Sequence, residues 1–355
     1  MAKKKGRILV LGAFGYDTNK LDGQTVKTRN VYRLLQQHSK RQVDAFDTMH
    51  VQTSPFSVLK LLWLLLRCNT LILLPAHNNL TYILPVAHFL SKLVGYSIIL
   101  ICIGGWQIEY FLGEKQFEGH PHPRQLRICK AIKAFLPEME AENRELIRRL
   151  CFTNSEVFPN FRMFDSIRPR KENVSDTLKL VYLARVMKQK GYDTIFRFAS
   201  LVEQNNYDIS IDFYGQIEPE DKDEFLSLVD KYKACVRYLG ALQEDAITDC
   251  LTNYDVMLFP TQFYTEGLPG TVLDAYIAGL PVIATEWKHS REFIEDTQTG
   301  FIVPFDDCQN AFNERIMTLY KDRQMLAEMK EKAFQRRMQF SPESAWTVLS
   351  KYING

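Results

Sequence analysis

The chain has 355 residues, of which 46% are hydrophobic and 24% charged, and its formal net charge is +2. The length favours two domains over a single core, and the composition excludes a disordered chain. The seven cysteines are scattered singly without a C-x-x-C pair, which argues against a disulfide framework and a structural zinc site.

The charge is divided unevenly along the chain. Residues 1–165 hold 22 Lys and Arg against 13 Asp and Glu, a balance of +9, and the remainder holds 22 against 29, a balance of −7. A basic half joined to an acidic half suggests that the first half faces an anionic partner. Chance variation on solvated faces is the alternative.

Strand-like and helix-like patterns alternate from the start of the first half. The basic beginning MAKKKGRILVLGAFG has too short an apolar run for a signal peptide, and RILVLG at 7–12 is expected to be a first strand. A helix is expected at 25–37, strands at 70–75 and 97–104 with a helix at about 81–94 between them, and a long charged helical region from about 122 to 150.

Two apolar segments, 56–75 and 81–105, were considered as membrane spans. The first is interrupted by Lys60 and an RCNT break, and the second by Ser91, Lys92 and Gly95. Neither offers about 20 uninterrupted apolar residues, so no span is predicted. A helix followed by a buried strand explains each segment.

A polar stretch at 166–176 is expected to be a linker, and the alternating pattern restarts after it. Strands are expected at 178–184, 208–215, 236–240, 255–261 and 281–285, with helices near 191–204, 219–233, 243–253 and 270–279 between them. FIVP at 301–304 and helices at 308–320 and 322–338 follow, and a short helix closes the chain. This pattern predicts two Rossmann-like α/β domains with parallel sheets, whose ligands bind outside the carboxyl ends of the strands. Those ends can face each other across a cleft.

Two constellations in the second half suggest a ligand that contains a diphosphate. Arg185 ends a strand and Lys190 precedes the next helix, a pair of cations suited to a diphosphate. In TEGLPGTVLDA, Glu266 and Asp274 bracket a glycine-rich helix start, where free N–H groups attract anions. A ligand whose phosphate groups bind the N–H groups and whose hydroxyl groups bind the acids would explain both constellations.

Positions 178–304 resemble the donor-binding half of the family-4 retaining glycosyltransferases, which have the GT-B fold. The matching pieces, in the family's order, are LVYLARVMKQKGYDTI, DFYGQ, VRYLGALQEDAITDCLTNYDVMLFPT, EGLPGTVLDAYIAGLPVIAT and TGFIVP. The resemblance implies that Arg185 and Lys190 bind the donor diphosphate, that Glu266 meets the transferred sugar and that Asp274 meets the ribose. Asp274 departs from the family pattern, which usually has Glu there. The remaining donor-binding residues implied are Gly215, Gly267, Leu268, Gly270 and Thr271.

The first half resembles glycosyltransferases of bacterial capsule and exopolysaccharide synthesis, in ILVLGAFGYDTNKLDGQTVKTRN, ILLPAHN, IGGWQIEY and FPNF. The resemblance implies that Gly23 and Gln24 approach donor phosphates or acceptor, and that Gly105 and Trp106 lie on the acceptor side. Many family members carry a histidine near that point, but GGW has none, so no catalytic base is assigned. A core or domain-interface role for Trp106 stays open.

The resemblance predicts an acceptor-binding domain at 1–168, a nucleotide-sugar-binding domain at 169–340 and a helix at 341–355 packing back on the first domain. The expected function is a retaining, metal-independent transferase in bacterial surface polysaccharide synthesis, with Glu266, Arg185 and Lys190 in catalysis. Its donor is expected to be a UDP- or GDP-linked sugar, without a cofactor, and its acceptor a polyprenyl-diphosphate-linked glycan. The expected location is cytoplasmic, with peripheral contact with an anionic membrane and no nucleic-acid partner.

Several alternatives remain at this point. A nucleotide-sugar epimerase and a non-catalytic partner subunit share the architecture. His120 and His122 are a weak metal pair, and Asp221-Lys-Asp223 is more typical of a solvated acidic helix start than of a metal site. A set of basic residues between 124 and 149 could meet anionic lipid headgroups: Arg124, Arg127, Lys130, Lys133, Arg144, Arg148 and Arg149.

Overall fold

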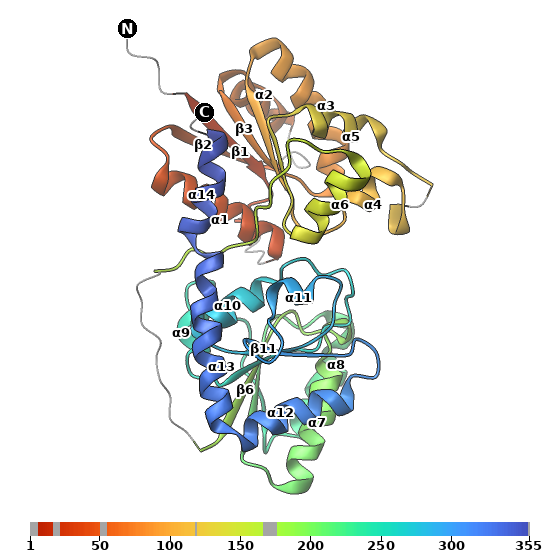
Figure 1. The fold of residues 1–355 in the computed structure, drawn as a ribbon, viewed down its shortest axis with the longest axis vertical. Coiled ribbons are helices and arrows are strands. Elements are labelled where there is room, and N and C mark those ends of the chain that lie inside the picture. The colour runs from red at the N-terminus through yellow and green to blue at the C-terminus, as the bar shows by residue number, and fades with distance from the viewer. Residues whose placement is uncertain (1–5, 17–21, 50–54, 118, 166–175, 354–355) are drawn as a thin grey trace. The chain divides into compact units, whose positions relative to one another are not determined.

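The computed structural model describes residues 6–16, 22–49, 55–117, 119–165 and 176–353. The chain divides into two compact units, one of residues 1–163 with 340–355 and the other of residues 164–339. The domain boundaries predicted from the sequence lie after residues 168 and 340. Most of the expected linker, including the boundary after 168, lies outside the described residues. Figure 1 shows the helices and strands of both units.

The N-terminal unit is built on a five-stranded sheet in the order β2-β1-β3-β4-β5, in which all pairs are parallel. The strands are β1 (Arg7–Gly12), β2 (Gln42–Asp47), β3 (Thr70–Leu74), β4 (Ser97–Ile101) and β5 (Ala134–Leu136). The three central strands are almost wholly apolar and buried, as expected for a parallel sheet covered on both faces.

Helices cover the two faces of this sheet. One face packs against α1 (Gly23–His38) and α14 (Pro342–Ile353), through Leu34 and Leu349 among others. The other face packs against α2 (Pro55–Arg67), α3 (His77–Val94), α4 (Gln107–Leu112), α5 (Pro123–Ala131) and α6 (Glu140–Leu150). The last helix of the chain therefore completes the core of the first unit.

The prediction of one long helical region at 122–150 is wrong. The structure has α5, then strand β5, then α6 in this segment. β5 has only three residues, Ala134–Leu136, too few for the sequence pattern to separate it from its helical flanks. The edge strand β2 was also not predicted, because polar residues interrupt QVDAFD.

The C-terminal unit has a six-stranded parallel sheet in the order β11-β10-β9-β6-β7-β8. Its strands are β6 (Leu178–Leu183), β7 (Ile209–Tyr214), β8 (Val236–Tyr238), β9 (Val256–Phe259), β10 (Val282–Thr285) and β11 (Gly300–Val303). Its helices are α7 (Tyr192–Asn205), α8 (Lys222–Lys231), α9 (Ile247–Leu251), α10 (Gly270–Ala278), α11 (Ser290–Phe293), α12 (Gln309–Lys321) and α13 (Arg323–Arg336). The predicted class of two Rossmann-like α/β domains is confirmed. The facing of their sheets across a cleft stays a prediction.

Gly215 follows β7 at a point where only glycine fits. Its φ is +140°, and a Cβ built there would lie 1.7 Å from the carbonyl oxygen of Ala184, which follows β6. The backbone amide of Gly215 also donates to the Gly240 carbonyl, at 3.0 Å. Gly215 therefore brings the loops after β6 and β7 into direct backbone contact.

Gly215→Ala is expected to lower the free energy of unfolding by about 3 kcal/mol, because it adds a backbone clash to an unfavourable φ. Gly240→Ala is the matched control, since Gly240 also has a positive φ, +80°, but has open space around its Cβ position. We expect that control to cost about 1 kcal/mol. Chemical denaturation of the three proteins measures both, and equal losses would contradict the clash.

Candidate functional site

The loops that follow the neighbouring strands β6 and β9 carry the charged residues predicted from the sequence. Lys190 ends a short 3-10 turn, Lys188–Lys190, between β6 and α7. The next residue, Gly191, has φ +81°, and a Cβ there would lie 1.8 Å from the carbonyl oxygen of Pro260. The turn is therefore pressed against the end of β9, which places Lys190 beside the loop that leads to α10.

Lys190 and Glu266 form an ion pair at this point. The Lys190 ammonium contacts Glu266 Oε1, and the side chains are 15% and 16% exposed. Thr261 Oγ1 donates to the same carboxylate oxygen at 3.2 Å, and the Lys190 Nζ lies 4.8 Å from the centre of the Phe263 ring. Because the pair is mostly shielded from solvent, its charges act more strongly than those of a surface pair.

Helix α10 begins next to this pair with no cap from a side chain. Its N-cap residue is Pro269, which makes no side-chain hydrogen bond, and its first turn contains no acidic residue. The positive end of the helix dipole is thus not offset by a carboxylate in the helix's own first turn. Gly267 and Leu268 precede the helix, and Gly270 is its first residue.

Thr271 and Asp274 lie further along α10. The Thr271 hydroxyl donates to the carbonyl oxygen of Leu183, the last residue of β6, at 2.7 Å. This hydroxyl therefore fixes the helix start against the strand end, and its single O–H donor is already used. Asp274 lies one turn into the helix and is 7% exposed.

Arg185 has a different environment from Lys190. Its guanidinium donates to Glu218 Oε1 at 3.1 Å, and its side chain is 58% exposed. Its backbone is held by Tyr182, whose hydroxyl donates to the Arg185 carbonyl at 2.8 Å. Burial, together with the nearby Glu266 charge, raises the pKa of Tyr182 well above its ordinary value, so the hydroxyl stays a donor.

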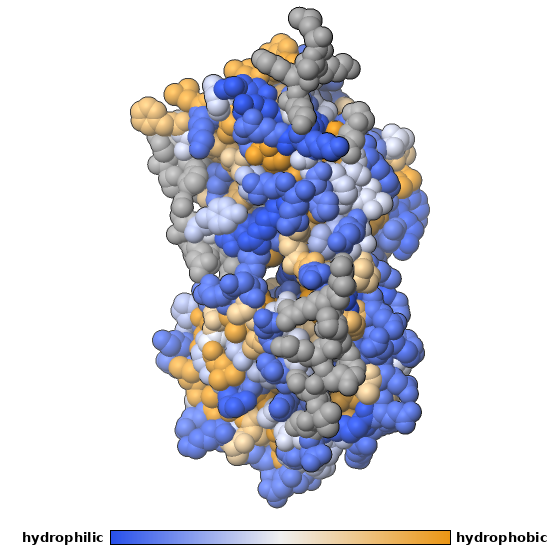
Figure 2. Space-filling model, turned by 90° about the vertical axis from the view of Figure 1, so that its left-hand side faces the viewer, coloured by the Kyte–Doolittle hydropathy of each residue, from blue (hydrophilic) through white to orange (hydrophobic). Residues whose placement is uncertain are grey.

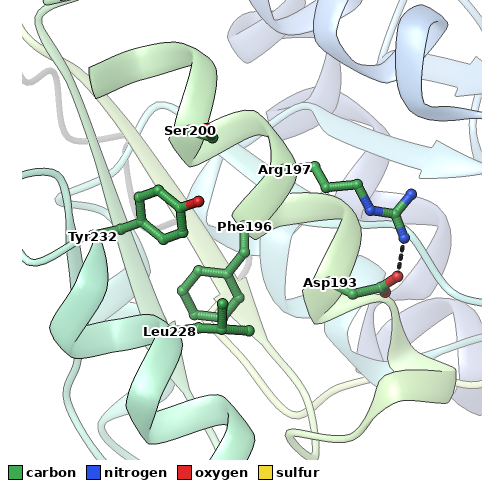
Figure 3. Close-up of a pocket in the computed structure, with 6 residues that line it drawn as sticks. All are labelled: Asp193, Phe196, Arg197, Ser200, Leu228 and Tyr232. Carbon is green, nitrogen blue, oxygen red and sulfur yellow. Dashed lines mark hydrogen bonds and ion pairs between the residues drawn. The ribbon is translucent and has the colours of Figure 1, made fainter. Parts of the chain in front are cut away.

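Two hollows open in the surface of this unit. One, of about 590 Å³, is lined by Glu218, Gln216 and Tyr238 among others, so the carboxylate that holds Arg185 forms part of its wall. The other, of about 370 Å³, lies between α7 and α8, where Asp193 pairs with Arg197 (Figure 3). No predicted site residue lines the second hollow, and the first is the one next to the candidate site.

The N-terminal unit holds a buried ion pair that the sequence analysis missed. Lys27 on α1 is fully buried, and its ammonium donates to Glu138 Oε1 at 2.6 Å and to the Cys102 carbonyl at 3.0 Å. The other oxygen of Glu138 accepts from the Gly104 amide at 3.1 Å. The pair therefore ties α1 to the loop after β4, one residue before Gly105.

The predicted residues of the acceptor side occupy the same edge of this unit. Trp106 is partly buried, its indole N–H donates to the Ile103 carbonyl at 2.8 Å, and its ring packs edge-on against Tyr110. Gly23 begins α1, and the Gln24 side-chain nitrogen is buried without a hydrogen-bond partner among the described residues. That nitrogen is thus an unused donor in the described part of the structure, whereas the Trp106 indole N–H is already used.

The two weak metal candidates are engaged in other contacts. His122 lies 3.8 Å from the Tyr110 ring, centre to centre, and its Nδ1 is 2.9 Å from the Tyr110 carbonyl oxygen. Asp221 accepts from the Lys188 amide and the Tyr192 hydroxyl, each at 3.2 Å. Both therefore take part in the local structure of their loops.

Comparisons with known proteins point to one family. Residues 163–336 match the family described as glycosyl transferases group 1. The chain is 22% identical over 229 residues to the capsular polysaccharide biosynthesis glycosyltransferase CapM of Staphylococcus aureus, covering 62% of this chain and 58% of CapM. It is 22% identical over 168 residues to the N,N'-diacetylbacillosaminyl-diphospho-undecaprenol alpha-1,3-N-acetylgalactosaminyltransferase of Campylobacter jejuni, covering 47% and 42%. The chain thus covers less than two thirds of the length of the curated relatives it matches.

Among solved structures, the chain is similar to HepE of Anabaena in complex with UDP and glucose. The TM-score is 0.71 at 16% identity, and the match covers 98% of this chain and 99% of HepE. At this identity the similarity shows the fold, and with the family match it confirms the predicted GT-B class and the predicted resemblance to capsule and exopolysaccharide glycosyltransferases.

Thr271→Val should lower the free energy of unfolding by about 1 kcal/mol, since it leaves the Leu183 carbonyl without its donor. Thr271→Ser keeps the hydroxyl and is the control. Thermal unfolding compares the two variants. Equal stability of the Val and Ser variants would show that the hydroxyl does not hold α10 to β6.

Proposed function

We propose that this chain, whose residues 163–336 match the family of group 1 glycosyl transferases, transfers a sugar from a nucleotide-sugar donor to a glycan acceptor in bacterial surface polysaccharide synthesis. The observation that carries the proposal is the Lys190–Glu266 pair beside the uncapped start of α10. This arrangement offers a cation, free N–H groups and a carboxylate within one loop region, which are the groups that a sugar diphosphate needs.

In this proposal Lys190 and Arg185 bind the donor diphosphate. Both cations pair with carboxylates in the structure, Glu266 and Glu218 respectively. The phosphate oxygens would replace these partners, and the N–H groups at Gly270 and Thr271 would donate to the same anion. The charges are preorganised, since Lys190 is held beside the ring of Phe263 before the donor arrives.

The diphosphate is also the leaving group of the reaction. As the bond between the sugar carbon and the phosphate oxygen breaks, negative charge grows on the diphosphate, and Lys190 stabilises it. The acceptor hydroxyl forms the new bond to the same carbon, and its proton passes to the leaving phosphate oxygen. Attack on the face that the diphosphate leaves gives retention, without a covalent nucleophile or a metal ion.

The carboxylates take the polar groups of the donor. Glu266, once released by Lys190, accepts hydrogen bonds from sugar hydroxyls and orients the ring. Asp274 accepts from the ribose, and Gly215, Gly267 and Leu268 line the approach to the nucleotide. UDP and GDP are the candidate nucleotides, and the UDP bound in the Anabaena structure supports the first.

The acceptor is proposed to be a polyprenyl-diphosphate-linked glycan. The printed name of the Campylobacter relative specifies a diphospho-undecaprenol substrate, which supports this class. Gly23, Gln24, Gly105 and Trp106 would lie on the acceptor side, with the buried Gln24 nitrogen as a donor. The protein would then work at the cytoplasmic face of the membrane, as a peripheral protein.

Lys190→Ala is expected to lower turnover by about 10²-fold, the effect of removing one preorganised charge from the transition state. Lys188→Ala is the matched control. Lys188 lies two residues away and pairs with Glu224 at 2.6 Å, outside the candidate site. Turnover is measured as the acceptor-dependent release of nucleoside diphosphate from UDP- and GDP-sugars. Equal turnover in wild type and Lys190→Ala would contradict the assignment of Lys190.

Donor class is tested by a thermal-shift panel of UDP, GDP, ADP and CMP on the wild type, Lys190→Ala and Lys188→Ala. One nucleotide should raise the melting temperature of the wild type and Lys188→Ala but not of Lys190→Ala. Conversion of a nucleotide sugar to its epimer without acceptor would instead support an isomerase. A panel without any stabilisation would contradict a donor site that forms without acceptor.

A further inference from the structure

Helices α2, α3 and α5 lie in one layer on the same face of the N-terminal sheet. They follow β2, β3 and β4 in a sheet whose order makes these three crossovers run in one direction, which places their helices on a single face. Leu64 of α2, Leu84 of α3 and Ile128 of α5 belong to the same core cluster. Gln125 of α5 also donates to the Thr81 carbonyl of α3. The sides of these helices opposite the sheet therefore point the same way.

Those outward sides of α2 and α3 carry regular apolar stripes. On α2 the exposed residues Phe56, Leu59, Trp63 and Leu66 follow one another at three- and four-residue steps. On α3 the exposed residues Tyr82, Val86, Phe89 and Leu93 do the same. Steps of three and four keep side chains on one side of a helix, so each stripe is a continuous face. We call these eight residues the apolar face.

Exposed hydrophobic residues cluster on these two helices more than on any other described part of the chain. Of the sixteen exposed large hydrophobic residues in the described part of the chain, ten lie on α2 and α3, including Phe56 at 80% and Leu93 at 69% exposure. Figure 2 shows one side of the molecule, on which exposed hydrophobic residues are interspersed with hydrophilic ones. Single exposed hydrophobic residues are ordinary, whereas a contiguous face of them indicates an interaction surface.

The charged residues on α2, α3 and α5 have a single sign. None of the residues at 55–67, 77–94 and 123–131, which form α2, α3 and α5, is Asp or Glu. Exposed cations lie on all three helices: Lys60, Arg67, Lys92, Arg124, Arg127 and Lys130. By contrast Arg148 and Arg149 on α6, which were also candidates for lipid contact, pair with Glu145 and Glu114. The layer of α2, α3 and α5 is thus complementary to an anionic surface.

We propose that the apolar face docks on a lipid bilayer that contains anionic lipids. Apolar side chains would enter the boundary between headgroups and acyl chains, and the flanking cations would meet the lipid phosphates. The described helices include none long and apolar enough to cross a bilayer. The proposed contact is peripheral, with the helices lying on the bilayer surface. The inference rests on the proposed function for its purpose, because a polyprenyl-linked acceptor is presented at a bilayer.

A second copy of the chain fits this face less well than lipid does. A twofold dimer through the apolar face would bring the cations of α2, α3 and α5 from both copies to one interface. These helices supply no carboxylate to neutralise them, so like charges would face each other without compensation. An anionic bilayer supplies both the apolar medium and the opposite charge.

The test is flotation of the purified full chain with vesicles of phosphatidylcholine, with and without phosphatidylglycerol. The wild type should float with the anionic vesicles. Phe89→Glu should bind these vesicles at least about tenfold more weakly, because one inserted apolar side chain is lost. Ile147→Glu is the matched control, because Ile147 on α6 of the same unit is 47% exposed but lies outside the apolar face. It should float like the wild type.

The other outcomes overturn the proposal. The proposal is overturned if the wild type floats with neither type of vesicle. It is also overturned if Phe89→Glu and Ile147→Glu lose vesicle binding equally. A wild type that does not float but is dimeric in solution, with Phe89→Glu monomeric, would assign the face to a second copy instead. The nucleotide thermal shift keeps the two proposals apart. A chain that floats without a nucleotide shift contradicts the proposed donor site alone, and a chain that shifts without floating contradicts the docking face alone.

Discussion

Strand β6 hydrogen-bonds in parallel to β9 on one side and to β7 on the other, so the loops after these three strands leave the sheet at one edge. Two glycines bring those loops into backbone contact, Gly191 against Pro260 and Gly215 against Ala184. The positions of Lys190 and Arg185 follow from these contacts, because each lies next to one of the junctions. The candidate site therefore depends on backbone geometry before it depends on charge.

The charges of the site are balanced before any ligand is present. Lys190 is held by Glu266, and Arg185 by Glu218. A mostly buried cation such as Lys190 would cost folding free energy without a partner, so Glu266 stabilises the unit. In the proposed function, a diphosphate would carry enough negative charge to replace both partners, and it would free Glu266 for a sugar in the same step. In the proposed function, the same ion pair would serve both the stability of the unit and the binding of a donor.

Sequence patterns predicted the alternating strands and helices, the two Rossmann-like units and the loop positions of Lys190 and Glu266, since periodicity and strand ends are local properties. They did not predict contacts between distant segments. The Lys27–Glu138 pair joins residues 111 positions apart, and Glu138 follows β5, a strand hidden inside a predicted helix. The Thr271 hydroxyl likewise finds its acceptor on Leu183, 88 positions away. Tertiary packing, which a single sequence does not encode locally, decides these.

Exposure is the other property that apolar patterns leave undecided. The segments at 56–75 and 81–105 were interpreted as helices followed by buried strands, and the structure confirms those elements as α2 with β3 and α3 with β4. Yet the helices are apolar on two sides. One side packs on the sheet through residues such as Leu64 and Leu84, and the opposite side carries Trp63 and Phe89 to the surface. A helix that needs only one apolar side for its core gains no folding stability from the second. The second apolar side is therefore suited to bind an apolar partner outside the unit, and the cations around it favour a partner with an anionic surface.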